Sequence, residues 1–491
     1  MFALSRSQEI VWLHEQLFPD SRAYNFSASL DLRGPLDEPA LRRSLTEVLA
    51  RHDGLRLELD PDSFPPRQRV SPDCAPRYRT VDLSGGDDPE ALFDRLWRRQ
   101  HDDPFDTARA PMVRWTLVRL GPDHHRLLQT EHHLVHDGWS FCLVLRDLFT
   151  LYREATRGIP ADLPAPGSYA AHVRAETVRD GAARDGAARD GAAHREEALA
   201  YWRSSLRDAR FDLPLPGRAD PDRARRAPDG AQLRLSVSPD RAALLRTVAR
   251  RDGLTPFSVL FTLFAELLRR LSGRGDLVIG SAVGNRAPGT EETVGMFVNT
   301  IPLRLRLRPG DSARDAVEDT TDVLLRSLPH QHVPVQDLAR EMGVHSSGGL
   351  DNPLFRVMFS AHDAPLPRIR DLDVEVALHE GHNTGTSRFD LDVVLIPDAR
   401  RTVGPSTGEA GMVLVWDYAA DLWDASTIDG LHTRLMALLD AFLDAPDTPL
   451  ERLVPEADPA GPLTPLTPHT PLTPHTPTPL SPLTGSNRGR S

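Results

Sequence analysis

The alternation of apolar and polar positions divides the first 175 residues into strand-like and helix-like segments. Three segments predict strands: 23–32, 112–120 and 126–133. Residues 37–52 have apolar positions at helical spacing, with Asp37 near the start of the predicted helix. Residues 138–156 place Phe141, Leu145, Leu148 and Tyr152 on one helical stripe. A second strand-to-helix junction is therefore expected close to residue 138.

The same reading applies to the second half of the chain. A helix is expected at 195–206, followed by a strand at 233–238, helices at 240–253 and 255–273, a strand at 276–285, and a strand with a long closing helix at 416–446. Strands and helices alternate in both halves, which favours a mixed α/β fold of the α+β sandwich type in two lobes. Ligand sites favour the interface between such lobes.

Two segments of biased composition suggest where these lobes begin and end. Residues 179–193 repeat the five-residue unit Arg-Asp-Gly-Ala-Ala and are expected to form a linker, which separates a first lobe at 1–178 from a second at 194–455. Residues 456–491 are rich in proline and threonine without core-forming periodicity, so they predict a disordered tail.

Composition narrows the class of function. The formal net charge of −12 argues against nucleic-acid binding, which needs a clustered basic face. All 58 basic residues are arginine, which excludes a P-loop lysine, a Schiff-base lysine or an adenylate-forming lysine in this chain. Two cysteines are too few for a disulfide scaffold. Without a membrane-length apolar run or a basic region before the first apolar residues, a cytoplasmic enzyme is expected.

The stretch EHHLVHDGWS, residues 131–140, concentrates the candidate chemistry. A zinc site would use His132, His133 and His136, but adjacent strand residues point to opposite faces, and an H-E-x-x-H helix is missing from the sequence. No metal is therefore expected. A serine nucleophile at Ser140 would need the second glycine of a G-x-S-x-G turn, which is also missing.

Two interpretations of this stretch remain open on the residues alone. The histidines could be satisfied core residues, or one of them could act as a general base, with the backbone N–H groups from Gly138 to Ser140 stabilising an oxyanion. Asp137 could serve as a structural ion-pair partner, because a buried carboxylate needs a charged or hydrogen-bonding partner. That role requires an arginine distant in sequence.

Eight segments of the chain then resemble one known family. HHLVHDG resembles the HHxxxDG motif of the condensation domains of nonribosomal peptide synthetases, which belong to the chloramphenicol acetyltransferase superfamily. The other matches follow in family order: 4–13, 51–59, 168–173, 294–305, 330–338, 351–360 and 386–395. Asp53 in the second of these motifs stands where the family usually has glutamate.

This resemblance implies a V-shaped pair of acetyltransferase-like lobes with a tunnel at their interface. Carrier proteins would deliver substrates as thioesters on phosphopantetheine arms, with no cofactor bound to the enzyme itself and no membrane partner. A donor acyl group would be joined to an acceptor amine in natural-product biosynthesis. The resemblance further suggests a monomeric enzyme that acts free-standing, because neither an adenylation nor a carrier-protein motif is found.

The resemblance also assigns roles to individual residues. His133 would be the catalytic base or would orient the nucleophile, and Gly138 would keep the tunnel open beside the pantetheine arm. Support of the site would come from His132, Asp137 and Arg286, with Arg286 as the ion-pair partner of Asp137, and the tunnel would be lined by Trp139, Ser140 and Asn299.

Other functions compete with amide formation. The same histidine could serve an alcohol acceptor and form an ester, and the acceptor could be a free small molecule. A coenzyme A-dependent acyltransferase and a non-catalytic recruitment platform are further alternatives. Epimerisation and heterocyclisation are disfavoured, because FVNT resembles condensing relatives and the paired histidines are intact.

Overall fold

The computed structural model describes most of the chain. It covers residues 1–184, 189–215, 229–344, 352–381, 385–398, 401–404 and 410–453. The expected tail at 456–491 lies outside the described residues, as do residues 185–188 within the repeat. Within the described ranges, no helix combines the length and the apolar character needed to cross a membrane.

The first half of the chain builds most of one six-stranded sheet, in the order β14-β12-β2-β7-β6-β5. Its strands are β2 (Asn25–Arg33), β5 (Arg77–Asp82), β6 (Val113–Gly121), β7 (His124–His132), β12 (Glu375–Glu380) and β14 (Thr402–Val403). β5 and β6 are parallel and the other neighbours are antiparallel. This sheet confirms the strands expected at 23–32, 112–120 and 126–133.

Helices cover both faces of this sheet. One face packs against α2 (Glu38–Arg51) and α4 (Gly138–Arg157), whose apolar stripes form one hydrophobic cluster with β2 and β7. The other face carries α3 (Pro89–Asp102), which contributes Phe93 and Trp97 to a smaller cluster. α2 and α4 confirm the helices expected at 37–52 and 138–156.

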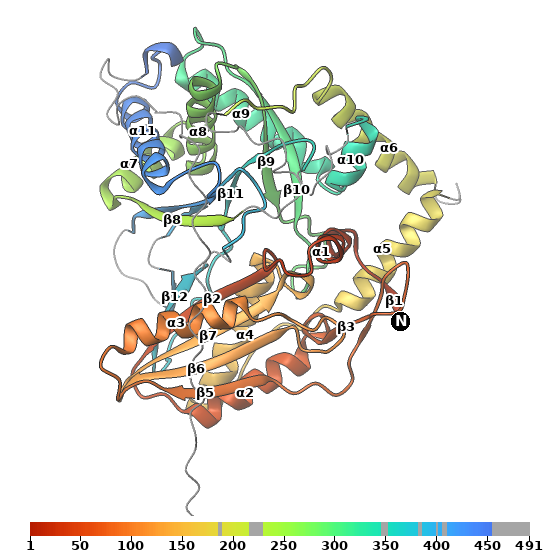
Figure 1. The fold of residues 1–491 in the computed structure, drawn as a ribbon, viewed down its shortest axis with the longest axis vertical. Helices are drawn as coiled ribbons and strands as arrows, with labels where there is room; N and C mark the ends of the chain where they lie inside the picture. Colours follow the sequence, from red (N-terminus) through yellow and green to blue (C-terminus); the bar gives the residue numbers. More distant parts are fainter. Residues whose placement is uncertain are drawn as a thin grey trace, which may run out of the picture.

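The second half builds a six-stranded sheet in the order β10-β9-β11-β13-β15-β8. Its strands are β8 (Gly230–Val237), β9 (Asp276–Val283), β10 (Asn299–Arg306), β11 (Val357–Ala361), β13 (Leu391–Ile396) and β15 (Met412–Ala419). The helices of this half are α7 (Pro239–Arg251), α8 (Pro256–Ser272), α9 (Ala313–Ser327), α10 (Val335–Glu341) and α11 (Ala425–Asp444). The expected mixed α/β fold in two lobes is confirmed, because the two sheets lie in separate halves of the molecule (Figure 1).

The lobes are not consecutive pieces of the chain. β12 and β14, which the sequence assigns to the second lobe, join the first sheet, where β12 pairs antiparallel with β2 in the register His379 to Ser29. A strand can pair with an exposed sheet edge that the fold brings beside it, and the edge that β12 meets, on β2, is distant from it in sequence. The boundary expected at residue 194 therefore does not account for β12 and β14 in the first sheet.

Part of the linker expected at 179–193 is helical. α5 (Tyr169–Arg184) and α6 (Arg189–Ser205) extend into the repeat from both sides and run along one side of the molecule between the lobes (Figure 1). Three of the five repeat positions are good helix formers, so the repeat need not interrupt a helix.

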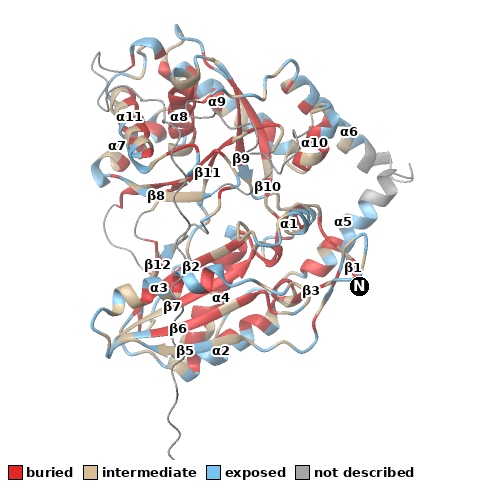
Figure 2. Ribbon diagram, in the orientation of Figure 1, coloured by how far each residue is buried: buried red, intermediate tan, exposed pale blue. Residues whose placement is uncertain are grey.

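The first lobe also contains a three-stranded sheet near the N-terminus. It has the order β1-β4-β3, with β1 (Phe2–Ala3), β3 (Leu57–Asp60) and β4 (Arg67–Val70), and it lies beside α1 (Arg6–Leu17). A cluster of buried residues there includes Leu134 and Val135 from the first lobe and Met296 and Phe297 from the second half. Burial is concentrated in the strands of both sheets and in α8 (Figure 2). The residues after β7 therefore lie where the two halves meet.

Candidate active site

The junction between β7 and α4 is held by the side chain of Asp137. β7 ends at His132, a short 3-10 helix covers His133–Val135, and α4 begins at Gly138. Asp137 is the N-cap residue, and its Oδ1 accepts a hydrogen bond of 2.7 Å from the Ser140 N–H. The first N–H groups of a helix have no partner within it, so this cap fixes the start of α4.

Two of the three histidines lie beside carboxylates. His132 Nε2 lies 2.6 Å from Glu15 Oε1, and the Leu134 N–H donates to His132 Nδ1 at 3.2 Å. His136 Nδ1 lies 3.0 Å from Glu131 Oε1. The described residues contain no group of three or more histidine, cysteine, aspartate or glutamate side chains that could hold a metal ion.

The ring of His133 has a different environment. It meets the rings of Tyr24 and His136 edge to face, with centroid distances of 5.8 and 5.4 Å. The Nδ1 atom of His133 is buried and has no hydrogen-bond partner within the part of the chain that the structure describes. The half-buried His133 side chain is thus the one motif histidine not held by a carboxylate.

Burial holds the pKa of His133 well below its ordinary value of 6.5, because a charged ring loses hydration inside the protein. Electrostatic interactions with His136, Arg388 and His132 lower that pKa further. The neutral ring is therefore the stable form of His133 at physiological pH. A neutral imidazole can accept a proton or a hydrogen bond, which is the state a general base requires.

Asp137 also connects the two halves of the chain. Its carboxylate accepts hydrogen bonds from Arg286 at 2.9 and 3.1 Å and from the Phe297 N–H at 3.1 Å. The Asp137 side chain is 4% exposed and that of Arg286 is 11% exposed. The structure thus brings together the two residues expected to pair. Both oxygens of the Asp137 carboxylate accept hydrogen bonds from the protein.

Arg286 is held by more than this ion pair. Its guanidinium donates to the carbonyl oxygens of Thr290 and Thr293 at 2.9 and 2.7 Å, and it lies 4.0 Å from the ring centroid of Phe297. These contacts fix the loop that follows β9 against the start of α4. The motif in the first lobe is consequently supported from the second half of the chain.

Ser140 and Trp139 make contacts between the halves. Ser140 Oγ donates to the Gly295 carbonyl at 2.8 Å and accepts from the Gly295 N–H at 3.0 Å and from Arg286 at 2.8 Å. These three hydrogen bonds occupy the Ser140 hydroxyl, which is therefore not arranged as a nucleophile. The Trp139 side chain is 40% exposed, and its indole N–H donates to the Glu291 carbonyl at 2.9 Å.

Gly138 faces open space at the start of α4. A Cβ built on Gly138 would meet no atom within 4 Å. The requirement for glycine here does not come from packing within the described protein. Gly138 is instead exposed at the start of α4.

Asn299 is oriented differently from the expected tunnel residue. Its amide donates to the carbonyl oxygens of Gln331 and Val333 at 2.6 and 2.8 Å, and the residue is 5% exposed. Asn299 therefore holds the segment before α10, with both N–H groups of its amide engaged by protein.

Several residues around the site could not be selected from the motif. Glu15, Tyr24 and Glu131 surround the three histidines, and Arg388 lies 5.4 Å from the ring centroid of Tyr24. Only Arg388 had a signal in the sequence, since it belongs to the motif match at 386–395. Glutamate and tyrosine positions are common, and their proximity to His133 follows from the fold.

A mixed α/β protein whose two lobes are each built on a sheet of their own has the chloramphenicol acetyltransferase-like fold that condensation domains share. The condensation domain family profile matches residues 1–459, and the chain belongs to this family. Condensation domains are acyltransferases that form amide bonds in nonribosomal peptide synthesis, and they act on substrates carried by phosphopantetheine without a resident cofactor. The resemblance seen in the sequence is confirmed.

Curated relatives are much longer than this chain. It is 32% identical over 445 residues to the phosphinothricin tripeptide synthetase PhsC of Streptomyces viridochromogenes, covering 89% of this chain and 38% of that protein. It is 30% identical over 459 residues to malpibaldin synthetase of Mortierella alpina, covering 91% of this chain and 8% of that protein. The chain thus spans well under half of these relatives.

Solved structures share the fold over nearly their whole length. The first condensation domain of the calcium-dependent antibiotic synthetase has a TM-score of 0.75 at 25% identity, covering 92% of this chain and 99% of that one. The starter condensation domain of rhizomide synthetase RzmA has a TM-score of 0.77 at 20% identity, with 92% and 96% covered. The acetyltransferase-like pair of lobes is confirmed by these matches.

Proposed function

We propose that this chain condenses a carrier-bound acyl or aminoacyl thioester with an acceptor amine, and that His133 serves the reaction. The observation that carries the proposal is the neutral His133 ring, whose buried Nδ1 has no hydrogen-bond partner within the described protein and which lies in the same β7–α4 connection as the exposed Gly138. Carrier proteins would supply the donor, and either a carrier or a free small molecule would supply the acceptor.

In this mechanism the acceptor nitrogen attacks the thioester carbonyl carbon and forms a tetrahedral intermediate. His133 accepts a hydrogen bond or a proton from the attacking amine. The first N–H groups of α4 lack acceptors within the helix, and those of Gly138 and Trp139 would face the oxyanion. The attack forms the C–N bond; collapse of the intermediate re-forms the carbonyl and breaks the C–S bond, and His133 passes the proton to the departing thiolate.

Asp137 and Arg286 act as positioning residues in this proposal. Their ion pair joins the start of α4 to the loop after β9. Residues from both halves of the chain therefore hold the segment from His133 to Gly138 in place. Positioning of this kind contributes to rate because reacting groups must be held within about 3–3.5 Å.

The proposal is tested by supplying a loaded donor carrier with matched amine and alcohol acceptors and determining the product by mass spectrometry. We expect an amide product that requires enzyme and amine. An ester product formed only from the alcohol panel would replace the amine assignment. Donor release with coenzyme A thioesters but with no carrier-bound thioester would favour the coenzyme A-dependent acyltransferase.

Substitution of Gly138 separates catalysis from stability. Gly138→Val places a branched side chain in the open space, so we expect acyl transfer to fall by about tenfold or more. Stability should not fall, because the new Cβ meets no protein atom within 4 Å and glycine carries an entropy cost of roughly 0.5–1 kcal/mol in a helix.

The matched control for this substitution is Gly85→Val, because a Cβ at Gly85 also meets nothing within 4 Å and the residue lies between β5 and α3. Rates of single turnover and urea midpoints should be measured for both variants. Normal transfer by Gly138→Val would show that no substrate arm passes this position.

The lowered pKa of His133 predicts the pH dependence of transfer. The ring stays neutral from pH 8 down to well below its ordinary pKa of 6.5, so the rate should not lose half its value near pH 6.5. The single-turnover rate should be followed with an acceptor whose own amine does not titrate in this range. A half-maximal rate at pH 6.5 would show that His133 titrates like an exposed histidine.

A further inference from the structure

A charged side chain from the second half of the chain lies beside the aromatic rings around His133. The guanidinium carbon of Arg388 lies 5.4 Å from the ring centroid of Tyr24, and the Tyr24 ring meets the ring of His133 edge to face at 5.8 Å. Tyr24 directly precedes β2 of the first sheet, whereas Arg388 precedes β13 of the second. Both lobes therefore contribute to the surroundings of His133.

The charge of Arg388 acts on two histidines of the first lobe. The pKa of His133 is lowered by burial, then by His136 and by Arg388. The ring of His14 meets that of Tyr24 edge to face at 4.9 Å, and its pKa is lowered to about 4, first by burial and then by Arg388. Charges act over such distances because buried protein screens them less than water does. The same cation thus disfavours the charged form of both rings.

Asp392 on β13 is the counter-charge of Arg388. Arg388 Nη2 lies 3.9 Å from Asp392 Oδ2, which is beyond hydrogen-bond distance. The Asp392 side chain is 11% exposed and that of Arg388 is 38% exposed. The Oδ1 atom of Asp392 is buried without a hydrogen-bond partner within the described ranges. Asp392 therefore offsets the charge of Arg388 only in part, and the remaining positive charge acts on the neighbouring rings.

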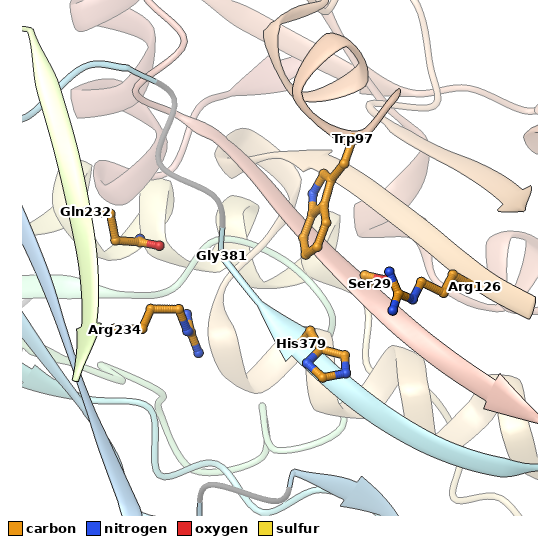
Figure 3. A pocket seen from close by; sticks show the side chains of 7 residues that line it. All are labelled: Ser29, Trp97, Arg126, Gln232, Arg234, His379 and Gly381. Atoms are coloured by element: carbon orange, nitrogen blue, oxygen red, sulfur yellow. The ribbon is translucent and has the colours of Figure 1, made fainter. Parts of the chain in front are cut away.

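The register of the second sheet shows which way Asp392 points. The core residues on β13 are Leu391, Val393 and Leu395. Side chains alternate along a strand, so Asp392 lies on the opposite face of the sheet. Asp392 is opposite Asp417 on β15, and Asp417 accepts a hydrogen bond of 3.0 Å from Gln232 on β8. Gln232 lines a groove of about 400 Å³ across from side chains of the first lobe (Figure 3). The face that carries Asp392 is thus the one turned towards the first lobe.

Burial raises the pKa of Asp392 to about 6, a rise that Arg388 opposes, Asp417 increases and His362, directly after β11, opposes. As the pH falls through this value, Asp392 takes up a proton and no longer offsets the charge of Arg388. The unbalanced cation then disfavours a charged His133 ring more strongly. This happens in the pH range where an ordinary histidine gains its proton.

The other titratable groups around His133 come from α1, β7 and the β7–α4 connection. Glu15 lies beside His132, and Glu131 lies beside His136. His132, His136 and Arg388 are the three neighbours whose electrostatic interactions lower the pKa of His133. Of these three, only the guanidinium group carries a charge that no pH in the working range removes. Arg388 is therefore the constant source of positive charge beside His133.

We propose that Arg388, with Asp392 as its counter-charge, is a positioning residue for acyl transfer that keeps the His133 ring in its neutral, proton-accepting form. The inference rests on the proposed function, in which His133 takes the proton of the attacking amine. It adds a permanent cation from the second half of the chain to that site. Once His133 holds the proton, the same cation favours its transfer to the departing thiolate.

The test follows the His133 ring directly, by NMR titration of the full chain labelled at histidine, with the His133 signal assigned by its loss in His133→Ala. Single-turnover transfer is measured over the same pH range, with an acceptor whose amine does not titrate there. The variants are Arg388→Gln, Arg388→Lys and Asp392→Asn. Arg306→Gln is the matched control, because Arg306 is also 3.9 Å from an aspartate, Asp276, and its side chain is 61% exposed.

Arg388→Gln should raise the titration midpoint of His133 towards 6.5, because the nearby positive charge is lost. The ratio of the transfer rate at pH 6 to that at pH 8 should fall by about twofold or more, the loss expected once the midpoint reaches 6. Arg388→Lys keeps the charge and should restore both values. Asp392→Asn should not raise the midpoint, and Arg306→Gln should match wild type.

An unchanged His133 midpoint in folded Arg388→Gln would overturn this inference and leave the proposed function intact. A raised midpoint in Asp392→Asn would overturn it as well, because loss of the carboxylate leaves Arg388 unbalanced. No transfer by wild type at any pH would contradict the proposed function, and the role of Arg388 in transfer with it, even where the midpoint of His133 shifts as expected.

Discussion

Replacement of His133 by alanine should lower the rate of acyl transfer by roughly 10²–10⁴-fold, the range that general acid–base groups contribute. The reason is that His133 is the one motif histidine without a neighbouring carboxylate, whereas His132 lies 2.6 Å from Glu15 and His136 lies 3.0 Å from Glu131. The alanine variant removes the neutral ring and leaves those contacts in place. Folding should be preserved, because the His133 Nδ1 has no hydrogen-bond partner within the described protein.

His125→Ala is the matched control for this prediction. His125 lies near the other end of β7 and is half-buried, and burial lowers its pKa as well. The control should keep the wild-type rate, and both variants should bind the loaded carrier. Full activity of His133→Ala would remove the catalytic assignment. Intact carrier binding without any wild-type turnover would favour a recruitment platform.

Replacement of Asp137 by alanine should reduce the free energy of unfolding by about 3–5 kcal/mol. The change leaves the Arg286 guanidinium, which is 11% exposed, without its carboxylate, and it removes the acceptor for the N–H groups of Ser140 and Phe297. Breaking a buried pair costs more than the pair contributes, because the remaining charge stays desolvated. Transfer should fall as well, since the start of α4 and the second half lose their common anchor.

Urea unfolding monitored by tryptophan fluorescence measures this effect. Asp322→Ala is the control, because the pair of Asp322 with Arg326 on α9 is exposed and such pairs contribute about 0–1 kcal/mol. The double variant Asp137→Ala with Arg286→Ala should be more stable than the sum of the two single losses implies. Two results would show that this ion pair does not hold the halves together. One is a loss of unfolding free energy in the double variant equal to the sum of the two single losses. The other is a loss for Asp137→Ala no larger than that for Asp322→Ala.

Local structure around the motif could be predicted because it depends on nearby residues. The strand expected at 126–133 and the helix at 138–156 correspond to β7 and α4, since alternation and a capping aspartate act within one turn or one strand. The requirement for a distant arginine followed from burial of Asp137 alone, and the family motif singled out Arg286, which the structure places 2.9 Å away.

Features that depend on the tertiary fold could not be predicted in this way. β12 has an ordinary strand pattern, and nothing in residues 375–380 indicates that its partner is β2 of the other lobe. Asn299 belongs to a matching motif, yet its amide is directed to the carbonyl groups of Gln331 and Val333. Partner choice and side-chain direction are decided by the completed fold.

The central claim is that this chain joins an acyl group to an amine at His133, and intact mass spectrometry of two carriers tests it most directly. A donor carrier loaded with an acyl thioester and an acceptor carrier loaded with an aminoacyl thioester are mixed with wild type or His133→Ala. We predict that the acceptor carrier gains the mass that the donor carrier loses, with wild type only. Retention of the acyl group on the donor carrier with both proteins, or equal transfer by both, would contradict this account.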